Sequence, residues 1–374
     1  MIYFDNSSTT LLKPKTVADA VYNAINNLEY SNPSRGSYDM SINALKAIHK
    51  TRLKIANLFN VEPLEVALTP NVTTSINLVL NSLLNKNDHV ITTMAEHNSV
   101  IRPLNHLKNL GIETSLLPLD EFGEINLNYL DKLLRPNTKA VVITTMSNVS
   151  GYRTNISYVY EFCRRNGLIL ILDAAQSAGL YEMNFKPLND LVVCFTGHKG
   201  LYGPQGTGGI ILKGNMSIRE VFSGGGGNSL DAHQENFMPN IFEYGTMNVH
   251  SNLGLVEGIE YINSMGINNI EKKLFEMTSY LYNELAKNKN VTLYTRLKST
   301  NGPIISFNYK DLSSKTLSEL LWNKGEIATR AGLHCAPYYH RSMQTVKRGM
   351  CRISLSTFNS THEIDKFLKL LYKI

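Results

Sequence analysis

Between about residues 64 and 213, short apolar runs alternate with amphipathic stretches along the chain. The runs AVVIT (140–144) and LILIL (168–172) are apolar at successive positions, so both faces of these strands should be covered. This alternation predicts an α/β fold with a mainly parallel, seven-stranded sheet between helices. The expected strands are 66–69, 89–93, 113–117, 139–145, 168–173, 191–196 and 209–213. Helices are expected between them at 73–84, 99–110, 127–134 and 156–166.

The flanking regions predict further helices and a second group of strands. An amphipathic helix is expected over 42–59, and a long helical region over about 251–287. The last part of the chain reads as strand, helix, strand and helix in PIISFNY (303–309), TLSELLWN (316–323), CRISLST (351–357) and HEIDKFLKLLYK (362–373). A chain of 374 residues is long enough for two domains of ordinary size.

Composition and charge argue against several classes of protein. No stretch approaches the run of about 18 apolar residues that a membrane span requires. The start MIYFDNSSTT lacks the basic region and apolar core of a signal peptide, so we expect a cytoplasmic protein. The net charge of +6 comes from scattered basic residues, which does not point to nucleic acid. The four cysteines show no CxxC pair and no zinc-ligand spacing, which argues against a disulfide framework or a metal site.

Ligand-type side chains cluster where the predicted strands end. A ligand of an open parallel sheet binds beyond the carboxyl ends of its strands. The residues at these ends are Thr73, His97, Asn148, Asp173, Gln176, Thr196, His198 and Lys199. Any one of them could be a cap or turn residue, but their accumulation at successive strand ends favours a binding site.

Two of these residues suggest a particular cofactor. Asp173 ends an apolar run at a depth where an unpaired carboxylate is costly, so it needs a cationic partner. Lys199 lies in TGHKGLYGPQGTGG, between a strand end and a glycine-rich turn. Taken alone, Asp173 could be a helix cap and Lys199 a solvated loop lysine. Together they supply what pyridoxal 5'-phosphate requires: a buried carboxylate for the pyridine nitrogen and a lysine for the Schiff base.

A phosphate site is predicted in the segment TPNVTTSINLVL (69–80), where a strand turns into a helix. Helix amino termini favour anions, and the segment adds hydroxyls and backbone amides. Thr73 is the first candidate ligand, joined by Thr196 and His198, although capping explains many such threonines. His97 follows another strand and is either an ordinary loop histidine or a ring that stacks on the pyridine.

A series of motifs occurs along almost the whole chain: YFDNSSTT, NPSRG, AEHNSV, SNVSG, LDAAQSAG, FTGHKGLYGPQGTGG, FEYGTMN, RAGLHCAP and CRISLSTFN. In this combination and order, the chain resembles the pyridoxal-phosphate cysteine desulfurases of the class V aminotransferase superfamily. The resemblance implies the fold-type-I architecture, with a large cofactor domain (16–250) and a smaller α+β domain (1–15 and 251–374). It also implies a homodimer with its sites near the subunit boundary.

The resemblance implies a role for each matching residue around the cofactor ring. Lys199 corresponds to the Schiff-base lysine and Asp173 to the partner of the pyridinium nitrogen. Gln176 corresponds to the residue near the phenolic oxygen, and His97 to the catalytic histidine that stacks on the ring. Asn148 in SNVSG corresponds to the asparagine beside cofactor and substrate.

The phosphate and substrate ligands are assigned in the same way. Thr73, Thr196 and His198 match phosphate ligands, and Thr246 resembles the phosphate contact donated by the second subunit. Arg352 matches the arginine that binds the substrate carboxylate, a task that suits a guanidinium because it can bond both oxygens at once. Two further arginines match the lining of the site: Arg330 and Arg35.

Cys335 in RAGLHCAP corresponds to the catalytic cysteine, and its surroundings agree. It lies in a Gly/Pro-bounded loop next to His334 and near Arg330, a setting that can favour thiolate. The other cysteines, Cys163, Cys194 and Cys351, lie in helix-like or strand-like runs, which are typical of small buried side chains.

The implied reaction converts L-cysteine to L-alanine. Lys199 acts as a base at the substrate Cα, and Cys335 takes the sulfur as a persulfide and passes it to a thiol acceptor. The short loop around Cys335 resembles the branch that uses a dedicated acceptor protein, which we expect to bind the basic stretch 340–348. Iron–sulfur clusters, modified tRNA and a cofactor are all open as destinations of the sulfur.

Some positions depart from the family pattern. Ser7 and Ser8 replace the usual two alanines, Met146 replaces a frequent histidine, and GGGGNS is a variant glycine loop. The alternatives are a selenocysteine lyase, an aminotransferase, an epimerase or a carbon–sulfur lyase on the same scaffold, or a binding protein with an idle cofactor. Cys335 argues against an aminotransferase. The intact set of Lys199, Asp173, Arg352 and Cys335 argues against a binding protein.

Overall fold

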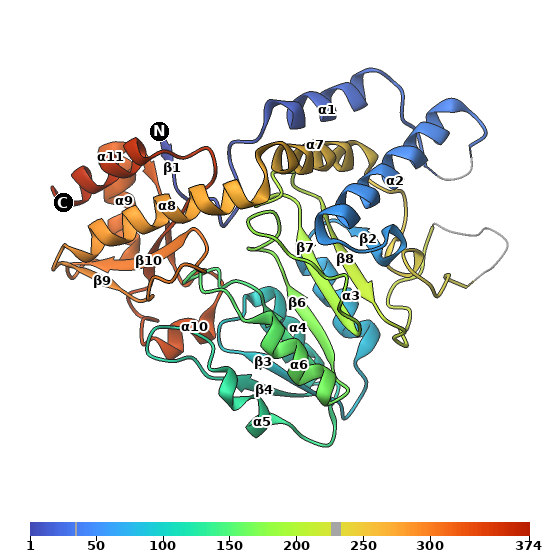
Figure 1. Ribbon diagram of the computed structural model, residues 1–374, viewed down its shortest axis with the longest axis horizontal. Helices are drawn as coiled ribbons and strands as arrows, with labels where there is room; N and C mark the ends of the chain where they lie inside the picture. The colour runs from blue at the N-terminus through green and yellow to red at the C-terminus, as the bar shows by residue number, and fades with distance from the viewer. Residues whose placement is uncertain (34–35, 226–232) are drawn as a thin grey trace.

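The structure, a computed structural model, describes residues 1–33, 36–225 and 233–374. It contains a seven-stranded sheet flanked by helices and, beside it, a smaller four-stranded sheet (Figure 1). Both chain ends lie with the smaller sheet. Within the described ranges, no helix is long and apolar enough to cross a membrane.

The large sheet is mainly parallel, as predicted. Its strands, in spatial order, are β2 (Val66–Thr69), β8 (Gly208–Lys213), β7 (Leu191–Thr196), β6 (Ile169–Asp173), β5 (Thr138–Thr144), β3 (His89–Thr93) and β4 (Glu113–Leu117). Every neighbouring pair is parallel except those of β8, which runs antiparallel to β7 and β2. Four of the seven predicted strands are confirmed at both ends, and the other three differ by a single residue at one or both ends.

Helices cover both faces of this sheet, which explains the unbroken apolar runs. In β5, Val141 and Ile143 belong to one hydrophobic cluster, whereas Ala140 and Val142 belong to another on the opposite face. The surrounding helices are α1 (Lys15–Asn26), α2 (Asp39–Phe59), α3 (Val72–Leu83), α4 (Asn98–Lys108), α5 (Leu130–Leu133), α6 (Ile156–Arg165) and α7 (Val249–Met265). Short 3-10 turns cover Pro63–Glu65, Leu127–Tyr129 and Asn240–Phe242.

The long helical region expected over about 251–287 is interrupted, so that prediction is wrong as a single helix. Helix α7 ends at Met265, and α8 (Ile267–Ala286) begins after Gly266, whose φ of 78° is readily reached only by glycine. The break separates two environments. Helix α7 packs against α1 and α2, whereas α8 contacts β9, β10 and α11 of the smaller unit.

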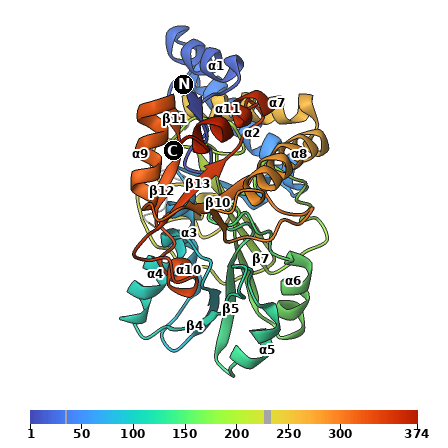
Figure 2. The same cartoon turned by 90° about the vertical axis from the view of Figure 1, so that its left-hand side faces the viewer.

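The smaller sheet is antiparallel, in the order β12 (Arg330–Gly332), β13 (Met350–Ser354), β10 (Ile304–Tyr309) and β9 (Val291–Leu293). Figure 2 shows α8, α9 (Ser314–Gly325) and α11 (Thr361–Leu371) around it. The predicted strands and helices of this region are confirmed. The sequence pattern missed short elements of this region, among them β9, β12 and helix α10 (Pro337–Ser342), which have three to six residues and are too short to show a usable period. It also missed helix α1 beside the large sheet.

The start of the chain is built into this smaller unit. Strand β1 (Ile2–Tyr3) pairs in parallel with β11 (Ile327–Ala328). Phe4 is fully buried, and its backbone oxygen accepts a hydrogen bond from the Ser354 amide at 2.7 Å. These contacts support the part of our domain proposal that joins residues 1–15 to a smaller domain of residues 251–374, with 16–250 as the other domain. Helix α7, which the proposal places in the smaller domain, packs instead against α1 and α2.

A core substitution should test whether the chain start depends on this packing. The Phe367 ring is buried, with the rings of Phe4 and Phe307 both at 6.1 Å in edge-on contact. We expect Phe367→Ala to destabilise the smaller unit by about 3–5 kcal/mol, because it leaves a cavity where three rings meet. Denaturant unfolding measures the loss, and limited proteolysis should cut the first 15 residues faster. The exposed Phe237→Ala should change neither, and equal effects of both variants would contradict the assignment.

Candidate active site

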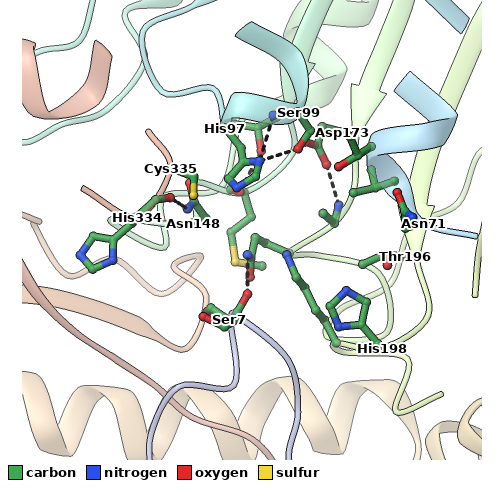
Figure 3. Close-up of a pocket in the computed structure, with 18 of the residues that line it drawn as sticks. Ser7, Asn71, His97, Ser99, Asn148, Asp173, Thr196, His198, His334 and Cys335 are labelled. Carbon is green, nitrogen blue, oxygen red and sulfur yellow. Dashed lines mark hydrogen bonds between the residues drawn. The ribbon is translucent and has the colours of Figure 1, made fainter. Parts of the chain in front are cut away.

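A cavity of about 700 Å³ lies at the carboxyl ends of the large sheet, where the smaller unit meets it (Figure 3). Most of the predicted site residues line it: Thr73, His97, Asn148, Asp173, Gln176, Thr196, His198, Lys199, Arg330, Cys335 and Arg352. Asp173 and Thr196 are the last residues of β6 and β7, and His97 caps α4 just after β3. The parallel strands therefore bring these side chains to one edge.

Two predicted residues stand apart from this cavity. Thr246 is exposed and lines a neighbouring cavity of its own chain, which shares Pro70, Thr74 and Gly206 with the first. Arg35, predicted to bind substrate, lies outside the described residues.

Asp173 is a buried carboxyl whose charge is only partly compensated. Its Oδ1 accepts a hydrogen bond from the Ala175 amide at 2.9 Å, and burial raises its pKa, opposed by this bond and by the charge of Lys199. Within residues 1–33, 36–225 and 233–374, it makes no ion pair. The sequence analysis predicted a cationic partner for Asp173. No described protein side chain takes this place at salt-bridge distance. A protonated pyridine nitrogen in the cavity fits this requirement.

Lys199 is buried in the same cavity. Burial lowers its pKa to about 8, while the carboxylates of Asp173 and Asp5 oppose the shift and Arg352 adds to it. A neutral amine is the reactive form of lysine, both as a nucleophile toward a carbonyl and as a base. A pKa near 8 gives Lys199 a sizeable neutral fraction near neutral pH, as its predicted role requires.

The other end of the cavity offers an anion site. Helix α3 begins there. Its N-cap residue is Asn71, whose side-chain oxygen accepts a hydrogen bond from the Thr74 amide at 3.0 Å. Hydroxyls of Thr73 and Thr196 and the ring of His198 complete the lining. His198 contacts the Thr9 hydroxyl through Nδ1 at 3.0 Å, and burial lowers its pKa to about 4, so the ring is neutral. Hydroxyls, amides and a helix amino terminus fit a phosphate.

His97 and Gln176 are held in fixed orientations. The Nδ1 atom of His97 accepts the Ser99 amide at 3.0 Å. Burial, followed by the charge of Lys199, lowers the pKa of His97 to about 4. Gln176 donates through Nε2 to the Ser7 backbone oxygen at 3.0 Å, which joins the large sheet to the start of the chain. A neutral His97 ring is suited to stacking on an aromatic cofactor.

Arg352 is buried and connects the substrate side of the cavity to the start of the chain. Its Nη2 donates to Asp5 Oδ1 at 2.7 Å and to Ser8 Oγ at 3.0 Å, and its Nη1 donates to the Asn148 backbone oxygen at 2.8 Å. Arg330 faces Arg352 across the β12–β13 pair, and its Nη1 lies 4.0 Å from Asp5 Oδ2. Two guanidinium groups therefore share one carboxylate, which leaves positive charge for an anionic substrate.

Cys335 is the accessible thiol of the chain. It is exposed and lines the cavity, whereas Cys163, Cys194 and Cys351 are buried and their thiol pKa values are raised by that burial. Two backbone oxygens of its loop accept hydrogen bonds at 2.7 Å. The Cys335 oxygen accepts one from the Asn98 amide, and the His334 oxygen accepts one from Asn148 Nδ2. The sequence-based division of the four cysteines is confirmed.

The neighbouring histidine plays a different part from the one expected. The His334 ring points away from Cys335 (Figure 3), and its Nε2 donates to the Met350 oxygen at 3.0 Å. Burial holds its pKa well below the usual value, so the ring is neutral. Positive charge near the thiol comes instead from Lys199 and Arg352, which line the same cavity. Burial lowers the pKa of both groups, and the neighbouring Cys335 opposes that shift.

Sequence reasoning missed Asp5, Asn71 and Glu96. Asp5 stands in a recognised motif, but only the fold shows that it pairs with an arginine 347 residues away. Glu96 is fully buried beside the cavity, where its Oε1 accepts Thr93 Oγ1 at 2.8 Å and the Thr144 amide at 2.9 Å. It thereby joins the ends of β3 and β5. Glu96 could have been found from the sequence, because it directly precedes His97 and closely follows the buried strand β3.

Comparisons with known proteins identify relatives over the full chain. The family model described as Aminotransferase class-V matches residues 2–367. A probable cysteine desulfurase of Pyrococcus abyssi is 32% identical over 100% of this chain and 94% of its own. A cysteine desulfurase of Escherichia coli is 29% identical over 100% of this chain and 93% of its own. The apo structure of cysteine desulfurase from Thermococcus onnurineus superimposes with a TM-score of 0.91 at 28% identity, covering 100% and 94% of the two chains.

The pH dependence of stability should report on Glu96. Burial raises its pKa from 4.5 to about 8, so the folded protein keeps a proton that the unfolded chain loses above pH about 4.5. The contribution of Glu96 to the free energy of unfolding therefore falls as the pH rises from about 4.5 toward 8. We expect the Glu96→Gln variant to gain stability over the wild type between pH 5 and 8, measured by denaturant unfolding.

The exposed Glu319→Gln variant is the control and should show no such trend. A constant difference between Glu96→Gln and wild type across this pH range would contradict the assignment.

Proposed function

The chain belongs to the class V aminotransferase family, and we propose from this that it is a pyridoxal-phosphate-dependent cysteine desulfurase of fold type I. The single observation that carries the proposal is the accessible thiol of Cys335 in the same cavity as Lys199, Asp173 and Arg352. The names of the full-length relatives support it. The reaction converts L-cysteine to L-alanine and leaves the sulfur on Cys335.

The residues of the cavity fit pyridoxal phosphate. Asp173 would pair with the pyridinium nitrogen, Lys199 would bind the aldehyde carbon, and His97 would stack on the ring with Gln176 near the phenolic oxygen. The phosphate ligands in this chain would be Thr73, Thr196, His198 and the amino terminus of α3. When bound, this cofactor supplies an electron-withdrawing ring that stabilises negative charge at the substrate Cα.

The protein residues then have distinct tasks. Arg352, with Arg330, binds the substrate carboxylate, and Asn148 holds the loop that carries Cys335. The neutral amine of Lys199 removes the proton from Cα. The Cys335 thiolate attacks the substrate sulfur: an S–S bond forms, the Cβ–S bond breaks, and its electron pair stays on Cβ, which takes up a proton from solvent. Lys199 returns to Cα the proton that it removed. The products are alanine and a Cys335 persulfide, so atoms and electrons balance without a further oxidant.

A homodimer is part of the proposal. The neighbouring cavity lined by Thr246 adjoins the phosphate end of the site through Thr74 and Gly206. Helices α1 and α2 expose several large apolar side chains, among them Tyr22, Ile25 and Leu45. A second subunit would cover such a surface and bring its own Thr246 to the phosphate.

We further propose that the persulfide sulfur passes to an acceptor protein in the cytoplasm. The basic stretch 340–348 supplies less surface charge than its sequence suggested. His340 is fully buried and bonds Thr345, and Arg348 donates inward to the Leu312 oxygen at 2.9 Å. Arg341 and Lys347 are exposed, so they are the basic groups of this stretch that would meet an acidic acceptor surface.

The test of the activity is alanine and sulfide formation from L-cysteine in the presence of a reductant. We expect Cys335→Ser to keep the yellow cofactor but lose sulfide release by at least about a thousandfold, because the hydroxyl cannot take up sulfur. Lys199→Ala should lose both colour and release. A yellow wild-type protein that leaves L-cysteine intact but acts on L-selenocysteine, or transfers an amino group, would refute the desulfurase assignment.

The dimer is tested by complementation between two defective chains. Thr246→Ala should weaken cofactor binding about tenfold, since one hydrogen bond to a charged group is lost. Mixed with Lys199→Ala, it should form heterodimers in which one site has both Lys199 and the Thr246 of the other chain. Sulfide release should then exceed that of either variant under subsaturating cofactor. A monomer by light scattering, or no gain on mixing, would overturn this arrangement.

A further inference from the structure

The Ser8 hydroxyl lies between the two charged groups of the substrate side. It donates to Asp5 Oδ1 at 2.7 Å and accepts from Arg352 Nη2 at 3.0 Å. Arg352 Nη2 itself donates to Asp5 Oδ1 at 2.7 Å, so the three atoms form a closed triangle. Ser8, Arg352 and Arg330 all line the cavity, so this triangle lies in its wall.

The bonds of Arg352 show which of its partners can yield to a substrate. Nη1 is engaged by the Asn148 backbone oxygen at 2.8 Å, and Nη2 by Asp5 and Ser8. Its Nε is buried and has no hydrogen-bond partner in the described part of the chain. The Asp5 contact is an ion pair and the Asn148 contact is to backbone. Only Ser8 is a neutral side chain that can rotate about one bond and exchange its partner.

The charges favour such an exchange. Asp5 Oδ2 lies 4.0 Å from Arg330 Nη1 while Oδ1 pairs with Arg352, so one carboxylate faces two cations. A second carboxylate arriving at Arg352 would balance the charge. The Ser8 hydroxyl, 3.0 Å from Arg352 Nη2, would then be a neutral donor beside that carboxylate, and Asp5 could keep its own bond to Arg352 when Ser8 turns away.

We propose that Ser8 is a specificity-determining residue that donates its hydroxyl proton to the substrate carboxylate beside Arg352. In the free enzyme this proton is held by Asp5. The inference rests on the proposed function, because it assumes that Arg352 binds the carboxylate of an amino acid. It assigns to Ser8 recognition of the carboxylate and no part in breaking the carbon–sulfur bond.

Steady-state kinetics of the holoenzyme separates these roles. We expect Ser8→Ala to raise KM for L-cysteine about tenfold with kcat within about twofold of wild type, because one hydrogen bond to a charged group is lost. For L-cysteine methyl ester, which lacks the carboxylate charge, KM should not change. Ser8→Thr, which keeps the hydroxyl, should restore KM for L-cysteine. Ser264→Ala, which removes an exposed serine hydroxyl on α7, is the matched control.

A purely structural role for Ser8 predicts a different pattern. If Ser8 acts only by positioning Arg352, Ser8→Ala should have no further effect on KM for L-cysteine in an Arg352→Ala background, whereas a direct bond to the carboxylate keeps its own effect there. Loss of the effect in that background, an equal effect on both substrates, or a lower kcat would overturn the proposal. Calorimetric titration of the holoenzyme with L-alanine measures binding without turnover. Ser8→Ala should weaken L-alanine binding about tenfold, as it raises KM for L-cysteine. A wild type that releases no sulfide refutes the desulfurase function instead, and L-alanine binding then decides the Ser8 proposal alone.

Discussion

The amine of Lys199 and the carboxyl of Asp173 are buried in one cavity, and the rest of the site is arranged around them. Burial shifts both pKa values toward the neutral forms, while the mutual attraction of the two charges opposes the shift. Such a pair is costly without further partners. A cofactor that offers Asp173 a cationic nitrogen and Lys199 a carbonyl carbon supplies both partners at once. The neutral rings of His97 and His198 add no further positive charge to this region.

The parallel sheet alone supplies only one side of the site. The substrate side is assembled from both ends of the chain: Asp5 and Ser8 come from the first segment, and Arg330, Cys335 and Arg352 from the last part. The ring of Phe4 and the pairing of β1 with β11 hold that first segment in place. Binding of the substrate carboxylate therefore depends on the packing of the smaller unit, whereas cofactor binding depends mainly on the strand ends of the large sheet.

The sequence predicted the parts of this arrangement that follow from local pattern. The strand ends bearing Asp173 and Thr196 could be placed because unbroken apolar runs mark buried parallel strands. Arg352 was assigned from a family resemblance alone, whereas Lys199 and Cys335 were also indicated by their positions in glycine-containing loops. The cavity brings all three together. The predicted domain boundaries remain a proposal. The break at Gly266 was missed because helical periodicity on both sides is strong and a single glycine is compatible with a continuous helix.

Long-range contacts and side-chain orientation could not be predicted in the same way. No local signal shows that Asp5 pairs with Arg352, or that the His334 ring turns to the Met350 oxygen rather than to the adjacent thiol. The buried state of His340 likewise depends on the packing of α10.

The whole site depends on Lys199 as the residue that binds the cofactor. Borohydride reduction of the purified protein, followed by proteolysis and peptide mass spectrometry, tests this role most directly. We expect reduced pyridoxal phosphate on the peptide that contains Lys199, in about one copy per chain. A protein that retains no pyridoxal phosphate when supplied with it, or that carries it on another lysine, would refute the assignment of Lys199.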